Sequence, residues 1–294
     1  MRSTPSDAEA DAAMPSDAAL PRGAVGRMVE RRRGGVPTRV RDAIAEEIPV
    51  AFVYNERPHA VMMATPHDLE EFALGFSLSE AIIEDAAQFE GIEVVEALAG
   101  YELRISIPNA NGARLEDRVR ELTGRTGCGL CGAQTLDAAV RHPAAVGSTA
   151  TIAEPALHAA LSALRERQPL GIATGAAHAA AWANAHGEIV LVREDVGRHN
   201  ALDKLIGAML HAHIDVAQGF VVVTSRASFE MVMKAASVGI GMLVAISAPT
   251  ALAIALAQEA NVTLVAFARA EGYSVYTHAD RIVSAEVPVR SVAP

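Results

Sequence analysis

The chain has 294 residues, of which 51% are hydrophobic and only 4% are aromatic. This length allows one or two domains, with a core built mostly from Ala, Val, Leu and Ile. The formal net charge of -10 argues against a general nucleic-acid-binding protein. Two closely spaced cysteines do not form the disulfide framework of a secreted domain. We find no signal-peptide pattern and no uninterrupted apolar run of transmembrane length, so we expect a cytoplasmic protein without a membrane partner.

The first part of the chain predicts a disordered tail followed by a small α+β region. Residues 1–35 are rich in Ala, Asp, Ser, Pro and Arg and lack apolar periodicity, which is typical of disorder. In the region 36–125 we predict strands at 48–54 and 59–63, which pair as a hairpin, and strands at 92–98 and 103–107. A helix is predicted after them at 114–122. Between the two pairs of strands, Thr65 as N-cap, Pro66 at the first helical position and Asp68 in the first turn predict a helix that extends to residue 76.

The rest of the chain predicts an α/β domain. The range 126–150 contains both cysteines and a predicted helix at 133–140. In 151–290 we predict strands at 180–185, 189–193, 219–224, 242–246 and 262–268. The predicted helices of this region are 155–167, 199–212, 228–238 and 250–260. Apolar strands separated by amphipathic helices predict a sheet that helices cover on both faces.

The cysteine loop reads R-T-G-C-G-L-C-G at residues 125–132 and holds Cys128 and Cys131. A structural zinc site needs four ligands, and the chain has no second cysteine pair, so we expect no metal. A thioredoxin-like dithiol would fit the spacing, but the surrounding elements do not follow the thioredoxin order. A third interpretation is a nucleophilic thiolate that carries sulfur, with a pKa lowered by glycine amides and a helix N-terminus. Inert buried cysteines are the remaining alternative.

Three polar segments follow predicted strands and open predicted helices: 193–204, 224–228 and 247–250. The first contains Arg198, His199 and Lys204, which are possible contacts for an anion. Such segments either cap their helices or bind ligands, because helix N-termini favour phosphate groups. Three of them at one edge of one sheet predict the rim of a ligand crevice.

His178 precedes a predicted strand in a loop of small residues. It is either a general base or ligand contact, or a core histidine with satisfied hydrogen bonds. Zinc deaminases use the patterns H-x-E and P-C-x-x-C. Here Ala180 stands two positions after His178, and Gly127 precedes Cys128. The chain therefore lacks the deaminase acid, and we do not expect deamination.

The glycine-framed cysteine loop, R-E-D-V-G-R-H-N-A-L-D-K at 193–204, T-S-R-A-S-F-E-M-V-M-K at 224–234 and S-A-P-T at 247–250 together resemble the FdhD family. The resemblance extends from about residue 36 to residue 283. It implies a formate dehydrogenase accessory sulfurtransferase that accepts sulfur from a cysteine desulfurase as a persulfide. The sulfur then passes to the molybdenum bis(molybdopterin guanine dinucleotide) cofactor, for insertion into formate dehydrogenase. The implied fold is a cytidine-deaminase-like layered α/β core beside a smaller N-terminal domain, commonly as a homodimer.

By the same resemblance, Cys128 matches the persulfide-bearing cysteine and Cys131 its partner. The stretch expected to contact the guanine dinucleotide is Phe267, Ala268, Arg269, Ala270, Glu271 and Gly272. Further expected cofactor contacts are Arg198, His199, Asn200, Lys204, Ser225 and Arg226. A non-catalytic cofactor-binding chaperone and a CxxC thiol-disulfide oxidoreductase are the alternative functions.

Overall fold

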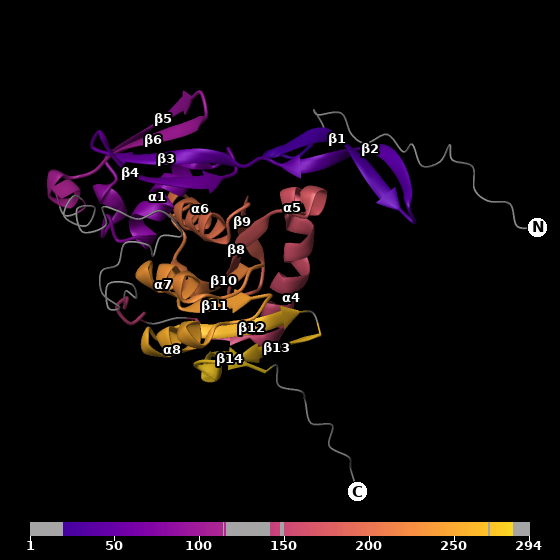
Figure 1. Cartoon of the computed structure of the whole chain (residues 1–294). Coiled ribbons are helices and arrows are strands. Elements are labelled where there is room, and N and C mark those ends of the chain that lie inside the picture. Colours follow the sequence, from indigo (N-terminus) through magenta and orange to yellow (C-terminus); the bar gives the residue numbers. More distant parts are fainter. Residues whose placement is uncertain (1–19, 114, 116–141, 148–149, 270, 285–294) are drawn as a thin grey trace, which may run out of the picture.

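The computed structural model describes residues 20–113, 115, 142–147, 150–269 and 271–284 (Figure 1). The larger part is a six-stranded sheet with helices on both faces, and a smaller four-stranded sheet with one main helix lies beside it. A two-stranded hairpin projects from the smaller part. The described chain is therefore a mixed α/β protein. None of its helices is long and apolar enough to cross a membrane.

The six-stranded sheet has the strand order β13-β12-β11-β10-β8-β9. Its strands are β8 (His178–Asn184), β9 (Ile189–Asp195), β10 (Gly219–Val223), β11 (Met242–Ala245), β12 (Thr263–Arg269) and β13 (Gly272–Val275). Strands β10, β11 and β12 are parallel to one another, whereas β8, β9 and β13 run antiparallel to their neighbours. The carboxyl ends of the three parallel strands therefore meet at one edge, which we call the rim.

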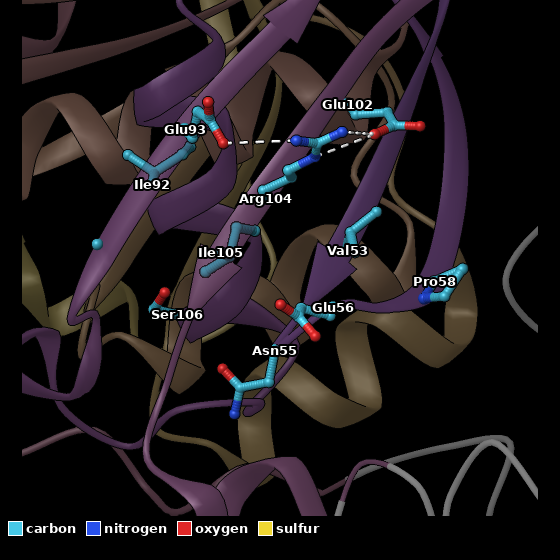
Figure 2. A pocket seen from close by; sticks show the side chains of 11 residues that line it. Val53, Asn55, Glu56, Pro58, Ile92, Glu93, Glu102, Arg104, Ile105 and Ser106 are labelled. Atoms are coloured by element: carbon cyan, nitrogen blue, oxygen red, sulfur yellow. Dashed lines mark hydrogen bonds and ion pairs between the residues drawn. The ribbon is translucent and has the colours of Figure 1, made fainter.

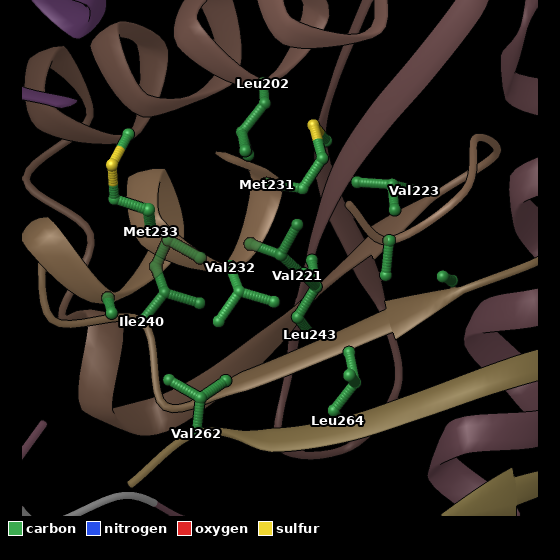
Figure 3. Close-up of a cluster of buried hydrophobic side chains, with 14 of the residues drawn as sticks. Leu202, Val221, Val223, Met231, Val232, Met233, Ile240, Leu243, Val262 and Leu264 are labelled. Atoms are coloured by element: carbon green, nitrogen blue, oxygen red, sulfur yellow. The ribbon is translucent and has the colours of Figure 1, made fainter. Parts of the chain in front are cut away.

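Helices cover both faces of this sheet, as its apolar strands predicted. On one face, α6 (Arg198–His211), α7 (Phe229–Ser237) and α8 (Ala251–Glu259) pack on alternate strand residues such as Val221 and Leu243 (Figure 3). On the other face, α4 (Glu154–Leu164) packs on the intervening residues, such as Val222 and Val244. Because both faces are buried, each central strand is apolar along its whole length.

The smaller sheet has the order β4-β3-β6-β5 and packs one face on α1 (Leu69–Ser79). Its strands are β3 (Ile48–Tyr54), β4 (Arg57–Ala64), β5 (Gly91–Ala97) and β6 (Gly100–Ser106). Phe52 of β3 packs edge-on against Phe72 of α1, with ring centroids 5.0 Å apart. The strands and the helix predicted for this region are thus confirmed.

The hairpin consists of β1 (Ala24–Arg33) and β2 (Val36–Ala45), paired antiparallel along their full length. Residues 1–35 were predicted to be disordered, and this prediction is wrong for the strand Ala24–Arg33; residues 1–19 lie outside the described chain. Gly34 and Gly35 turn the chain with φ values of 57° and 83°, a conformation that glycine adopts without steric cost. Pairing to β2, rather than an apolar pattern, makes this segment a strand.

Smaller elements complete the described chain. They are β7 (Ile152–Ala153), which pairs with β14 (Ile282–Val283), α5 (Pro169–Thr174), and the 3-10 turns Ala86–Gln88, Arg165–Arg167, Val216–Gln218 and Ala279–Arg281. The sequence did not predict α5 or β13. The helices predicted at 114–122 and 133–140 lie largely or wholly outside the described residues.

The start of α1 differs from the prediction. Its N-cap is Asp68, with φ 55°, and not Thr65. Thr65 instead donates its hydroxyl hydrogen bond to Asp195 at 2.8 Å, across to the larger sheet. A long-range acceptor therefore takes the hydroxyl that the local pattern assigned to a helix cap.

Helices α1 and α6 join the two parts of the protein through two glycines. A Cβ atom on Gly75 would lie 1.8 Å from the carbonyl oxygen of Asp203, and one on Gly207 would lie 2.0 Å from that of Glu71. No side chain fits at such distances, so the two backbones touch directly. The contact requires glycine on both helices.

We expect Gly75→Ala to lower the free energy of unfolding by about 2 kcal/mol, because the methyl group must push α1 away from α6. Urea denaturation measures this change. Gly91→Ala is the matched control, because a Cβ atom there meets nothing within 4 Å. Equal stability of Gly75→Ala and the unchanged protein would contradict the close contact.

Candidate functional site

The rim brings together the segments that the sequence placed after three strands. Ala227, after β10, forms a parallel bridge with Pro249, after β11. The backbone N–H of Phe267, near the end of β12, donates to the carbonyl oxygen of Ser247 at 3.1 Å. The predicted crevice edge is therefore a continuous surface.

Helices α6, α7 and α8 all begin at this rim; Thr250 caps α8 with its side chain, whereas α6 and α7 have no such cap. Helix α6 begins at Arg198 after Gly197, and α7 begins at Phe229 after Ser228. Neither N-cap residue caps its helix with a side-chain hydrogen bond. In the described chain, the buried Oγ of Ser228 and Nε of Arg198 have no hydrogen-bond partner. Free amides and free polar atoms at a helix start are suited to an anionic group.

Glu230 contacts the basic side chains of this region. Its Oε2 lies 2.9 Å from Nε2 of His199 and 4.0 Å from the guanidinium of Arg198. The hydrogen bond with His199 lowers the pKa of Glu230, so this carboxyl is ionised at neutral pH. Glu230 was not among the predicted site residues, although the sequence places it in the first turn of the predicted helix at 228–238.

His178 lies next to this cluster at the start of β8. Burial lowers its pKa, and the charges of Arg198 and His199 lower it further. His178 and Thr224 also line an open cavity of about 320 Å³ together with Arg165 and residues of α5. A neutral imidazole at this position can donate or accept a proton.

The segment at the end of β12 presents an aromatic ring. Phe267 is 47% exposed and has φ 52°, and the pairing with β13 is irregular between Ala266 and Arg269. A left-handed conformation at an aromatic residue is strained, and such strain is concentrated at functional sites. Arg269 and Glu271 are exposed as well, whereas the Ala268 side chain is buried; Ala270 lies outside the described residues.

Most of the segment 193–204 does not face the rim but ties the two sheets together. Lys204 is fully buried, with Nζ 2.7 Å from Asp195 and 2.8 Å from the hydroxyl of Thr65. Asn200 donates to Asp195 and to the carbonyl oxygen of Met63. The prediction that Lys204 contacts an anion is therefore wrong. Asn200 was also predicted as a cofactor contact, but its side-chain amide makes its hydrogen bonds inside the interface.

The other charges of this segment are also paired internally. Arg193 binds Glu71 at 2.6 Å, and Glu194 accepts from the backbone N–H groups of Leu170 and Gly171. Asp203 accepts from Ser79 at 2.6 Å and from Lys234 at 2.9 Å. We call the buried pairs Asp195–Lys204 and Asp203–Lys234, with Thr65, Ser79 and Asn200, the interface network. Of the segment 193–204, only Arg198 and His199 remain at the rim.

The segment 224–228 contributed two predicted cofactor contacts, Ser225 and Arg226, and only one of them is exposed. Arg226 is exposed at the rim, whereas Ser225 is buried and donates its hydroxyl to the carbonyl oxygen of Arg226. Ser225 thus shapes the loop rather than facing outwards. The candidate anion-binding residues are Arg198, His199, Arg226, Ser228 and Arg269, and Phe267 adds an exposed aromatic ring beside them.

Cys128 and Cys131 lie outside the described residues, but the flanking chain is placed. Leu115 is buried in the core of the smaller sheet, and Nδ1 of His142 lies 3.0 Å from Glu259 at the end of α8. Because α8 begins at the rim and ends at Glu259, His142 is at the opposite edge of the core. Among the described residues, no group of three or more His, Cys, Asp or Glu could hold a metal ion.

Comparisons with known proteins agree on one family. The sequence profile of the FdhD/NarQ family matches residues 45–283. The chain is 55% identical over 268 residues to a sulfur carrier protein FdhD of Xanthomonas euvesicatoria, covering 91% of this chain and 95% of that protein. It is 52% identical over 254 residues to the sulfur carrier protein FdhD of Cupriavidus necator, covering 86% and 88%. A crystal structure described as a formate dehydrogenase accessory protein from Desulfotalea psychrophila matches with TM-score 0.67 and 26% identity, covering 88% of this chain and 99% of that one.

The interface network generates a prediction about stability. Lys204→Met would leave Asp195 as a buried charge without its cation, so we expect a loss of about 3–5 kcal/mol in the free energy of unfolding. The double variant Lys204→Met/Asp195→Asn removes both charges and should recover most of this loss. Urea denaturation of the three proteins measures both effects. Unchanged stability of Lys204→Met would return Lys204 to the list of ligand contacts.

Proposed function

The chain belongs to the FdhD/NarQ family, and from this membership we propose that it carries sulfur for the maturation of formate dehydrogenase. In this proposal a cysteine desulfurase donates the sulfur in the cytoplasm. The recipient is the molybdenum bis(molybdopterin guanine dinucleotide) cofactor, which binds as cargo and is then inserted into formate dehydrogenase. The names of the relatives support the sulfur-carrier role. Family resemblance supports the donor, the cargo, a cytidine-deaminase-like layering and a homodimer.

The proposed sulfur carrier is Cys128. Its thiolate attacks the outer sulfur of the persulfide on the desulfurase, a new S–S bond forms, and the cysteine of the desulfurase leaves as a thiolate. In the delivery step, the Cys131 thiolate attacks the inner sulfur of the Cys128 persulfide. The outer sulfur leaves with the electron pair of the S–S bond, as hydrosulfide for the metal. The Cys128–Cys131 disulfide then needs two electrons from a thiol reductant before the next cycle.

The proposed binding surface for the cargo is the rim. Its phosphates would lie at the N-termini of α6 and α7, near Arg198, His199 and Arg226, where free donors are placed. The exposed ring of Phe267 offers a stacking surface for a guanine base. The observation that supports this assignment is the convergence of two uncapped helix starts and unpartnered polar atoms on one edge of the sheet.

The cysteine loop would have to reach the rim from the opposite edge. The 26 residues between Leu115 and His142 include both cysteines. Helix α8, which separates His142 from the rim, is roughly 14 Å long, and the 11 residue steps from Cys131 to His142 could span roughly 35 Å if extended. The distance is therefore within reach of the chain.

Sulfur transfer is tested by loading and by complementation. Incubation with a desulfurase and cysteine should add one labile sulfur atom, about 32 Da, to the protein as a persulfide. Cys128→Ala should abolish this addition. In a strain that lacks its own accessory protein, Cys128→Ala should restore no formate dehydrogenase activity. Activity with Cys128→Ala would instead support a cofactor-binding chaperone. Disulfide exchange without any desulfurase would support an oxidoreductase.

Cys131→Ala separates two roles of the second cysteine. If Cys131 releases the sulfur, this variant should load normally but fail in complementation. If Cys131 only tunes Cys128, the variant should load more slowly and still restore part of the activity. Mass spectrometry of the loaded protein and the enzyme assay together distinguish the two results.

The rim is tested with guanosine diphosphate as a probe for the nucleotide half of the cargo. Arg226→Ala should weaken binding about tenfold, since a charge-assisted hydrogen bond is lost. Glu230→Gln should strengthen binding by about threefold, because it removes a negative charge beside Arg198 and His199. Isothermal titration calorimetry measures both, with Arg104→Ala on the smaller sheet as control. A decrease in affinity for Glu230→Gln would contradict the proposed position of the phosphates.

A further inference from the structure

The hairpin β1–β2, which we call the arm, carries a charge opposite to that of the rest of the chain. Residues 24–45 contain six arginines and only two acidic residues, Glu30 and Asp42. The arm therefore has a net charge of +4, while the whole chain has -10. A strongly basic projection on an acidic protein is suited to an acidic surface.

The arm is also incompletely covered. It is a two-stranded sheet without a third strand, and only its base lies near α5. Met28 is 61% exposed and Val36 is 63% exposed. The exposed Arg33, at the tip, has no ion-pair partner among the described residues. Isolated two-stranded ribbons are marginally stable in water, so contact with a further surface would stabilise the arm.

A complementary surface exists on the smaller sheet, on the face away from α1. A cavity of about 730 Å³ lies there, and its lining includes Glu56, Glu93 and Glu102 beside apolar Val53 and Pro58 (Figure 2). We call it the acidic groove. Its one lining cation, Arg104, is paired with Glu93 at 3.6 Å and with Glu102 at 3.1 Å.

Glu56 is the unpaired acid of the groove. It is exposed and forms no hydrogen bond or ion pair within the described chain. Its φ of 67° places it in the left-handed region, directly after Asn55 with φ 47°. This conformation is strained for a residue other than Asn or Gly. The strained turn holds a free carboxylate at the groove.

The arm cannot reach the groove of its own chain. Strand β2 leads almost directly into β3, and the groove lies beside the far half of β3, where Glu102 and Arg104 of β6 pair with Ala51 and Val53. About fifteen residues of nearly continuous strand therefore separate Val36 at the tip from Ala51, a distance of roughly 50 Å. Two arms would also repel each other, because each carries +4. The acidic groove of another molecule remains as the complementary surface.

We propose that the arm of one copy of this chain lies in the acidic groove of a second copy, and that the contact is reciprocal. Arg33 and the neighbouring tip arginines approach Glu56, and the exposed apolar residues of the arm cover the apolar floor of the groove. A two-fold axis repeats the contact, which makes the interface isologous. This inference assigns surfaces to the proposed homodimer and does not depend on the sulfur chemistry.

Charge reversal tests the contact. The dimer dissociation constant, measured by sedimentation velocity over a dilution series, should rise about tenfold or more in Arg33→Glu and likewise in Glu56→Arg. Combining both changes in one chain exchanges the charges and should restore the dissociation constant to within about threefold. Salt at about 1 M should weaken the dimer of the unchanged chain, because it screens these pairs.

Matched controls are available at residues that belong neither to the arm nor to the acidic groove. Arg165→Glu and Glu166→Arg make the same charge changes at exposed positions without ion pairs in the described chain, and should leave the dimer unchanged. A monomeric unchanged chain, a dimer insensitive to both reversals, or a double variant that is not restored would each overturn the proposal. Cys128→Ala should dimerise normally, so a failure of the sulfur-carrier proposal is distinguishable from a failure of this one.

Discussion

The contact between α1 and α6 is the constraint on which the rest of this structure depends. Gly75 and Gly207 let the two backbones touch. This approach brings the hydroxyls of Thr65 and Ser79, in the smaller part, within hydrogen-bond distance of the buried ion pairs of the larger part. Buried charges are costly unless they are paired and hydrogen-bonded, and here each ammonium has both a carboxylate and a hydroxyl partner. Burial lowers the pKa of Lys204, and Asp195 opposes this effect. The close approach of α1 and α6 therefore completes the hydrogen bonding of both buried ammonium groups.

The same segment serves the interface and the rim because it turns from strand to helix. Asp195 ends β9 and points to the smaller sheet, while Arg198 and His199, in the first turn of α6, remain at the rim. Asp195 also accepts from the backbone N–H of Gly197 at 2.8 Å, which fixes the turn between the two. The position of the rim cations thus follows from the packing of the smaller sheet. A change in the interface would move the candidate binding residues without touching them.

The features that could be predicted from the sequence are those that local patterns determine, such as the helix starts. The helices that follow β10 and β11 start where Ser228 and Thr250 indicated, and Thr250 caps its helix by accepting from Ala253. The sequence did not predict β1, because that strand is arginine-rich and exists through pairing with β2. Nor could spacing assign Lys204, whose partner Thr65 lies 139 residues away. The sequence did contain one indication that Lys204 has a special role. Of the 25 lysine and arginine residues, only Lys204 and Lys234 are lysines.

That distribution has a physical reason. A lysine ammonium is compact and sits at the end of a flexible stem, so it can be surrounded by oxygen atoms in a closed space. The planar guanidinium of arginine has five donors in a fixed fork, which a pocket this small cannot satisfy. Arginine is suited instead to phosphates and carboxylates at accessible surfaces, and the exposed cations of the rim and the arm are arginines. The division of cations between the two residue types therefore separates charges that hold the fold together from charges that are available to bind another molecule.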